Sequence, residues 1–171
     1  MKAGLKGFTL VELLVAMSIT ALVSGATLMA LSQIYGGTDK NNDRVTAATQ
    51  VENAGFWIVR DAQRAMDIST DNLTAPDFLF IEWTEWDAAG EPTSYSVRYS
   101  FNGSTLKRTY LSTGGANQQT VVGVNLYYNP GDTANTSMAS YEDPVLTVRL
   151  SSILSKAHEA REFRIKRRPD V

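Results

Sequence analysis

Residues 7–31 read Gly7-Phe8-Thr9-Leu10-Val11-Glu12-LLVAMSITALVSGATLMAL, an apolar run in which Glu12 is the only charged residue. From residue 8 the run is 24 residues long, and a helix of that length reaches about 36 Å, enough to cross the ~30 Å hydrocarbon layer of a membrane. Its remaining polar residues are Thr, Ser and Gly, which membrane helices accept. The stretch therefore predicts a membrane-spanning helix near the start of the chain.

The charges around and within this run predict its orientation in the membrane and favour an anchor over a secretory signal peptide. Lys2 and Lys6 precede it, and no basic residue follows until Lys40, so the N-terminus is expected in the cytoplasm and the rest of the chain outside. A secretory signal peptide is the simplest alternative, since it shares the basic start and the apolar run. Against it, the run exceeds the ~7–15 apolar residues of a signal peptide. Glu12 also places a carboxylate near the membrane entrance at a cost of about 1–3 kcal/mol, which suggests a function for it.

The order of Gly7, Phe8 and Glu12 behind a short basic leader resembles the prepilin signature of type IV pilins and type II secretion pseudopilins. The resemblance implies a leader at residues 1–7, cleavage between Gly7 and Phe8, and N-methylation of Phe8. It also implies that Glu12 meets the free amino group of Phe8 on a neighbouring subunit and sets the axial register of assembly. The alternative for Glu12 is a carboxylate that merely reaches the lipid headgroups.

The same resemblance implies a location and a set of partners. The chain is expected as a single-pass protein of the cytoplasmic (inner) membrane, and later in an extracytoplasmic fibre or at the cell surface. Expected partners are other pilins or pseudopilins, the prepilin peptidase and N-methyltransferase, an assembly platform and an assembly ATPase. The sequence has no Walker-type phosphate-binding loop, so the motor energy must come from another protein. We expect no cofactor and no metal.

Beyond the membrane helix of residues 8–35, residues 36–69 are predicted to continue as an amphipathic helix into a head. Gly36 and Gly37 lower helix propensity by about 1 kcal/mol each and favour a bend or a melted turn. Apolar residues then recur in steps of three and four as far as about Ile68, and the charged residues between them form the water-facing side: Arg44, Glu52, Arg60, Asp61 and Arg64. Residues 56–65 resemble the corresponding helix of larger minor pilins and of the large minor pseudopilin.

Residues 70–171 are predicted to form an antiparallel β-sheet head. Apolar or alternating runs predict strands at residues 78–83, 95–101, 104–111, 121–128, 145–150 and 161–168. Asn102-Gly103 predicts a type I′ hairpin turn, residues 151–159 fit either a strand or one helical turn, and residues 87–92, 113–119 and 129–143 are expected as surface loops. The resulting fold class is α+β, a long N-terminal helix packed on a sheet of about five or six strands, as in pilins.

The composition leaves little room for catalysis. The chain has no Cys and one His, which excludes thiolate catalysis, Cys-based metal sites and the two-histidine zinc-protease motif. The spacing Asp39-x-Asn41-x-Asp43 opens like a calcium loop but lacks its later Gly and Glu, while Asp132, Glu142 and Asp143 stay open as head-loop calcium ligands. Ser104 and Lys107 have acylase spacing but would point to opposite sides of a strand. We therefore expect a structural subunit and not an enzyme.

The C-terminal residues concentrate positive charge on one predicted strand, at Arg161, Arg164, Lys166, Arg167 and Arg168. The net charge of −2 excludes a generally basic nucleic-acid coat. A solvated edge strand is the preferred interpretation, and contact of Arg164, Lys166 and Arg168 with DNA phosphates or another partner is the alternative. The sequence thus favours a minor pilin or pseudopilin, with a tip adhesin or DNA-uptake pilin and a membrane-anchored enzyme as alternatives.

Overall fold

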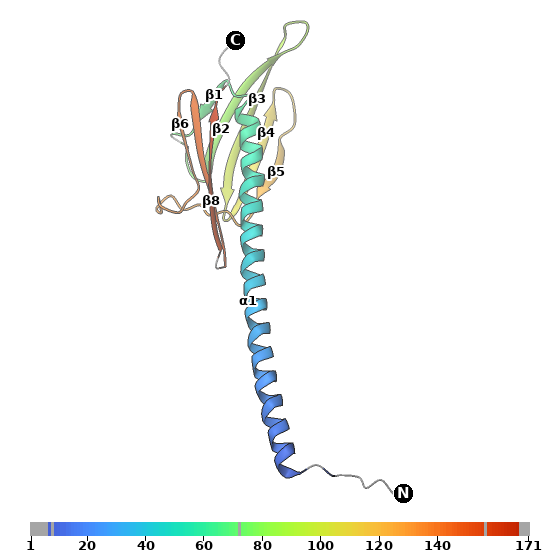
Figure 1. The fold of residues 1–171 in the computed structure, drawn as a ribbon. Helices are drawn as coiled ribbons and strands as arrows, with labels where there is room; N and C mark the ends of the chain where they lie inside the picture. Colours follow the sequence, from blue (N-terminus) through green and yellow to red (C-terminus); the bar gives the residue numbers. More distant parts are fainter. Residues whose placement is uncertain (1–6, 8, 72, 156, 168–171) are drawn as a thin grey trace. The chain divides into compact units, whose positions relative to one another are not determined.

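The structure is a computed structural model that describes residues 7, 9–71, 73–155 and 157–167. The chain divides into two compact units, Met1–Asn41 and Asn42–Val171. Helix α1 (Leu10–Ala62) begins in the first unit and ends in the second (Figure 1). The second unit, which we call the head, contains the last turns of α1 and the eight strands of the described residues, and it begins well before the head predicted at residues 70–171.

Two expectations about α1 were wrong. The helix continues through Gly36 and Gly37 without a break, because two glycines cost only about 2 kcal/mol together and the turns on both sides are helical. It also ends at Ala62 rather than near Ile68, and Asp67–Ser69 forms strand β1 instead. Pairing of Ile68 with Ile81 of β2 buries the Ile68 side chain, so tertiary contacts override the local helical pattern.

A five-stranded antiparallel sheet covers one side of α1 in the head. Its order is β1 (Asp67–Ser69), β2 (Asp77–Trp86), β3 (Pro92–Asn102), β4 (Thr105–Ser112) and β5 (Gln118–Gly123). The predicted β3–β4 hairpin is present, but its two-residue turn is Gly103-Ser104, because Asn102 pairs with Thr105. Gly103 has φ +59° and Ser104 has no positive φ, which fits a type II′ turn rather than type I′.

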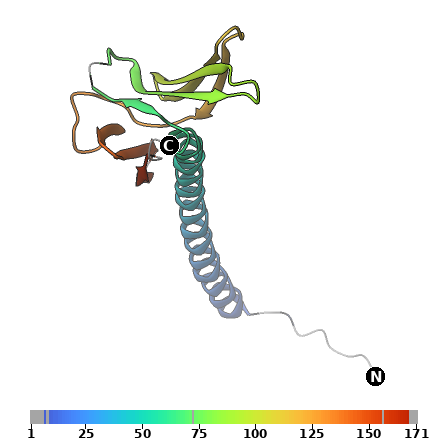
Figure 2. The same ribbon diagram turned by 90° about the horizontal axis from the view of Figure 1, so that it is seen from above.

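A second antiparallel sheet of three strands lies on another side of α1 (Figure 2). It consists of β6 (Met138–Glu142), β7 (Val145–Leu154) and β8 (Ala157–Lys166). The expectation of a single sheet was therefore wrong in this detail, although the α+β class with a helix on antiparallel sheet is confirmed. Strand β6 lies inside the stretch 129–143 that was predicted as a loop. Of the stretch 151–159, which fitted either a strand or a helical turn, residues 151–154 belong to β7 and residues 157–159 to β8.

The division into two sheets occurs just after β5. Strand β5 ends at Gly123, where an added Cβ would lie 2.8 Å from the Leu126 side chain and 3.2 Å from Ala54 of the helix. Asn125 then adopts a φ of +56°, and the chain turns so that Leu126 bridges Ser152 of β7. The predicted strand 121–128 is therefore cut short, because its second half leaves the first sheet to reach the second.

One core joins the helix to both sheets. The buried side of α1 in the head contributes Ala47, Val51, Ala54, Ile58 and Ala62. The large sheet adds apolar residues such as Leu79, Ile81, Val97 and Leu106, and the small sheet adds Leu146, Val148, Leu150 and Ile165. Helix α1 packs tightly against β8 at Gly55, where an added Cβ would clash with the ring of Phe163.

Candidate assembly site

The start of α1 carries the residues predicted to direct processing and assembly. Gly7 is exposed, while Phe8, Lys2 and Lys6 lie outside the described residues. The cleavage point and the methylation of Phe8 therefore stay predictions. Thr9 is the residue that precedes the first helical residue, Leu10, and it occupies the N-cap position.

Thr9 and Glu12 form a capping box at this helix end. The Glu12 backbone N–H donates to Thr9 Oγ1 at 3.2 Å, and Glu12 Oε2 accepts the Thr9 backbone N–H at 2.9 Å. The Thr9 hydroxyl also donates to Glu12 Oε2 at 2.9 Å. These reciprocal bonds satisfy two of the backbone donors that a helix N-terminus leaves unpaired. In a single chain the Glu12 carboxylate is thus held by the N-cap residue of its own helix.

The apolar part of α1 exposes its side chains along its whole length. Leu10, Leu14, Met17, Leu22 and Leu28 are each more than half exposed. The hydroxyls of Ser18, Thr20 and Thr27 each donate to the backbone carbonyl four residues earlier, at 2.8–2.9 Å. These hydroxyl groups therefore find their hydrogen-bond acceptors within the helix, as polar groups must in the water-free core of a membrane. Among the described residues, α1 is the one helix long and apolar enough to cross a membrane.

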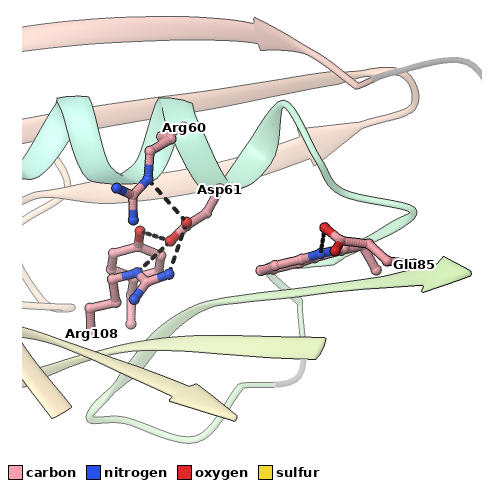
Figure 3. Close-up of polar contacts among 6 residues, drawn as sticks. Arg60, Asp61, Glu85 and Arg108 are labelled. Atoms are coloured by element: carbon pink, nitrogen blue, oxygen red, sulfur yellow. Dashed lines mark hydrogen bonds and ion pairs between the residues drawn. The ribbon is translucent and has the colours of Figure 1, made fainter. Parts of the chain in front are cut away.

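In the head, Asp61 belongs to a buried ionic cluster, so its predicted place on the water-facing side of the helix was wrong. Asp61 of α1 is 1% exposed, and its carboxylate accepts two bonds from Arg108 of β4, Nε to Oδ2 at 2.6 Å and Nη2 to Oδ1 at 3.0 Å. The Tyr99 hydroxyl of β3 donates to Oδ2 at 2.5 Å (Figure 3). Burial, with help from the Asp61 carboxylate, raises the pKa of Tyr99 well above its ordinary value.

A signal for this cluster was present in the sequence. Asp61 follows Ala54 by seven residues and Ile58 by three, so it shares their helical face. Arg108 lies between Leu106 and Tyr110 at alternating positions of a predicted strand, on the side that faces the core. Opposite charges at core positions of two packed elements predict a buried pair, which ties the end of α1 to the large sheet.

The structure separates the basic residues near the C-terminus. Arg161 forms an ion pair with Glu52 of α1. Arg167 forms another with Asp143, with 3.5 Å between Nη2 and Oδ1. Arg164 and Lys166 are exposed on β8. Glu162 shares their side of the strand, and Glu142 of β6 lies across the sheet from Lys166. Arg168 lies outside the described residues. The positive surface is thus smaller than the sequence suggested, and β8 is an edge strand.

The candidate calcium ligands are not brought together. Asp132 accepts bonds from the backbone of Ala134 and the side chain of Asn135 inside its own loop, and the Asn135 amide lowers the pKa of Asp132. Within the described residues, no group of three or more acidic or histidine side chains is arranged to hold a metal ion. Ser104 lies in the β3–β4 turn and Lys107 on β4.

Comparison with known proteins gives one match, at the N-terminus. Residues 5–28 match the family model of the prokaryotic N-terminal methylation motif. No curated protein and no solved structure matches the chain. The matched segment contains Gly7, Phe8, Glu12 and the Thr9–Glu12 capping box, and it includes most of the apolar part of α1. The chain therefore carries a prepilin-type methylation motif, which supports a type IV pilin-like protein anchored in the membrane by its N-terminal helix.

Proposed function

We propose that this chain is a minor structural subunit of a type IV pilus or a type II secretion fibre. The observation that carries the proposal is the methylation motif at residues 5–28, which extends into the exposed apolar part of α1 and precedes a separate β-sheet head. The resemblance of residues 56–65 to the helix of larger minor subunits favours the minor role. The subunit has a structural and not a catalytic task.

In this proposal the chain has four parts. The leader, residues 1–7, is removed on the cytoplasmic side by prepilin peptidase, and Phe8 is N-methylated. Residues 8–35 anchor the subunit in the inner membrane and later pack among the helices of other subunits. Residues 36–69 lead into the head, and residues 70–171 form most of it. The platform and ATPase that move the subunit out of the lipid are separate proteins.

Glu12 selects the position of each subunit in this proposal. Lipid-to-protein transfer of an apolar helix has little hydrophobic driving force, so packing and polar pairing must give preference and register. The Glu12 carboxylate is bound by the two Thr9 donors within its own chain. The amino group of Phe8 on a neighbouring subunit adds a positive charge beside the Glu12 carboxylate. A carboxylate buried among helices needs such a partner.

The test compares Glu12→Val with Ser18→Ala, a polar-to-apolar change six residues further along the same helix. Full-length chains are made in cells with the prepilin peptidase and a fibre assembly system, and sheared fibres are assayed for the subunit. We expect the Glu12→Val chain to be cleaved but absent from fibres, and the Ser18→Ala chain to be cleaved and present. Normal incorporation of Glu12→Val refutes the register role. Absence of the unaltered chain from fibres refutes the proposed function.

A further inference from the structure

The outward side of the last turns of α1 carries aromatic and basic side chains. Phe56 and Arg60 are four residues apart, so they share one side of the helix, and Trp57 lies beside them. Arg64 is exposed in the turn that follows, two residues after the helix ends at Ala62. Phe56 is 61% exposed, and its ring meets that of Trp57 edge to face with centroids 6.3 Å apart. The Arg60 guanidinium stands 3.9 Å from the centre of the Trp57 ring. We call these four residues the basic patch.

The positive charge of Arg60 and Arg64 in the basic patch exceeds the negative charge that lies beside it. Asp61 is the one acidic residue between Glu52 and Arg64, and its oxygens are taken by Arg108 and Tyr99. Arg60 Nε lies 3.8 Å from Asp61 Oδ1, beyond hydrogen-bond distance (Figure 3), and it is buried without an acceptor. In the part of the chain that the structure describes, no carboxylate lies within ion-pair distance of Arg64.

The opposite charge lies on the next segment of the chain. Between Arg64 and Arg98 the sequence has seven acidic residues, Asp67, Asp71, Asp77, Glu82, Glu85, Asp87 and Glu91, and no Lys or Arg. Glu85 and Asp87 flank Trp86, the last residue of β2, which is 60% exposed, and Glu91 ends the turn that leads into β3. Figure 1 shows this turn beyond the end of α1. We call Glu85, Trp86, Asp87 and Glu91 the acidic hairpin.

The acidic hairpin is held in one conformation. Asp87 Oδ1 accepts the backbone N–H groups of Ala89 at 2.8 Å and of Glu91 at 2.9 Å. The Asp87 N–H donates to the Glu91 carbonyl at 3.1 Å, and Gly90 supplies the φ of +82° that the turn requires. An exposed Trp on a preformed turn loses little conformational entropy on binding, so it is well suited to anchor a contact.

We propose that the acidic hairpin of one head docks on the basic patch of a second copy of this chain. Each surface offers what the other lacks, carboxylates with Trp86 on one and guanidinium groups with Phe56 and Trp57 on the other. Trp, Tyr and Arg are the residues that dominate binding energy at interfaces. Because the two surfaces differ, the contact between the two copies is heterologous. It goes beyond the proposed function, since it joins heads without using Phe8 or Glu12.

The absence of cysteine from the chain allows a direct test by disulfide formation. Full-length Arg64→Cys with one tag and full-length Asp87→Cys with another are made together in cells that lack prepilin peptidase, and membranes are oxidised mildly. We expect a dimer that carries both tags, because a disulfide forms only where the Cα atoms approach to about 4.4–6.8 Å. The control pairs Arg64→Cys with Ala160→Cys, an exposed residue on β8, and is expected to give no such dimer.

Charge reversal gives a second measurement on the same surfaces. Arg64→Glu is expected to abolish co-purification of two differently tagged full-length copies, and combination with Asp87→Lys on the other copy is expected to restore it. No two-tag disulfide dimer, equal yields from the two cysteine pairs, a cross-link to another protein in its place, or failure of the reversed pair to recover overturns the proposal. Since these experiments need no cleavage or fibre, they succeed or fail independently of the proposed function.

Discussion

Replacing Asp61 with alanine is expected to destabilise the head by about 3–5 kcal/mol, the cost of breaking a buried ion pair from one side. The Asp61 side chain is 2% exposed and that of Arg108 is 9% exposed, so the change leaves a guanidinium almost without water or a partner. The Tyr99 hydroxyl loses its acceptor as well, which alone costs about 1–3 kcal/mol when such a group stays buried. A loss of this size is a large share of the ~5–15 kcal/mol that stabilises an ordinary domain.

The assay is thermal unfolding of the full chain in detergent, followed by tryptophan fluorescence. For a domain of this size a loss of 1 kcal/mol lowers Tm by about 2–4 °C, so Asp61→Ala is expected to lower it by about 6–20 °C. Asp71→Ala, an exposed aspartate in a turn, is the control and is expected to change stability by less than about 0.5 kcal/mol.

A double variant separates the ion pair from simple damage to the core. Asp61→Leu combined with Arg108→Met replaces both charges by apolar groups, and such exchanges are often neutral or stabilising. We expect the double variant to be more stable than Asp61→Ala. A loss of less than about 1 kcal/mol for Asp61→Ala would refute the reasoning, because it would mean that Arg108 is not left buried and unpaired.

Three further predictions follow from single contacts. Gly55→Ala is expected to cost about 1–3 kcal/mol, since its Cβ would lie 2.2 Å from Cζ of Phe163; chemical denaturation measures this, and full stability would contradict the close approach. Stability is expected to fall by about 1.4 kcal/mol per pH unit above about pH 10, because the unfolded chain loses the Tyr99 proton there while burial raises the pKa in the folded head. Tyr99→Phe should remove that part of the slope in alkaline unfolding experiments, and an unchanged slope would count against it. Thr9→Val is expected to weaken the start of α1 by about 1 kcal/mol, seen as faster amide exchange of Glu12; unchanged exchange would argue against the capping box.

The apolar start of α1 was predictable because its signals are local. The apolar run and the position of Glu12 are read directly from neighbouring residues, and the motif match at residues 5–28 rests on the same stretch. Most strands were also found, since alternation and the Gly103 turn are properties of short segments. The turn moved by one residue because Gly-Ser as well as Asn-Gly fits a two-residue loop.

The errors arose where distant contacts decide. Ile68 follows a helical pattern in the sequence, but it pairs with Ile81 in the large sheet. Leu126 continues a strand pattern, but it leaves the large sheet and forms a bridge with Ser152 of the small one. Asp61 was assigned to the water-facing side since a charge on a helix is usually solvated, and only its helical phase together with Arg108 indicates otherwise. The division of the basic residues between Glu52, Asp143 and solvent likewise depends on packing that no local pattern encodes.

Intact-mass and N-terminal mass spectrometry of the subunit purified from its native membrane or fibre tests the central claim most directly. The account predicts a chain that begins at N-methylated Phe8 and keeps the apolar helix. A chain that still begins at Met1, or one cut downstream near Gly36 and released without the helix, would contradict it.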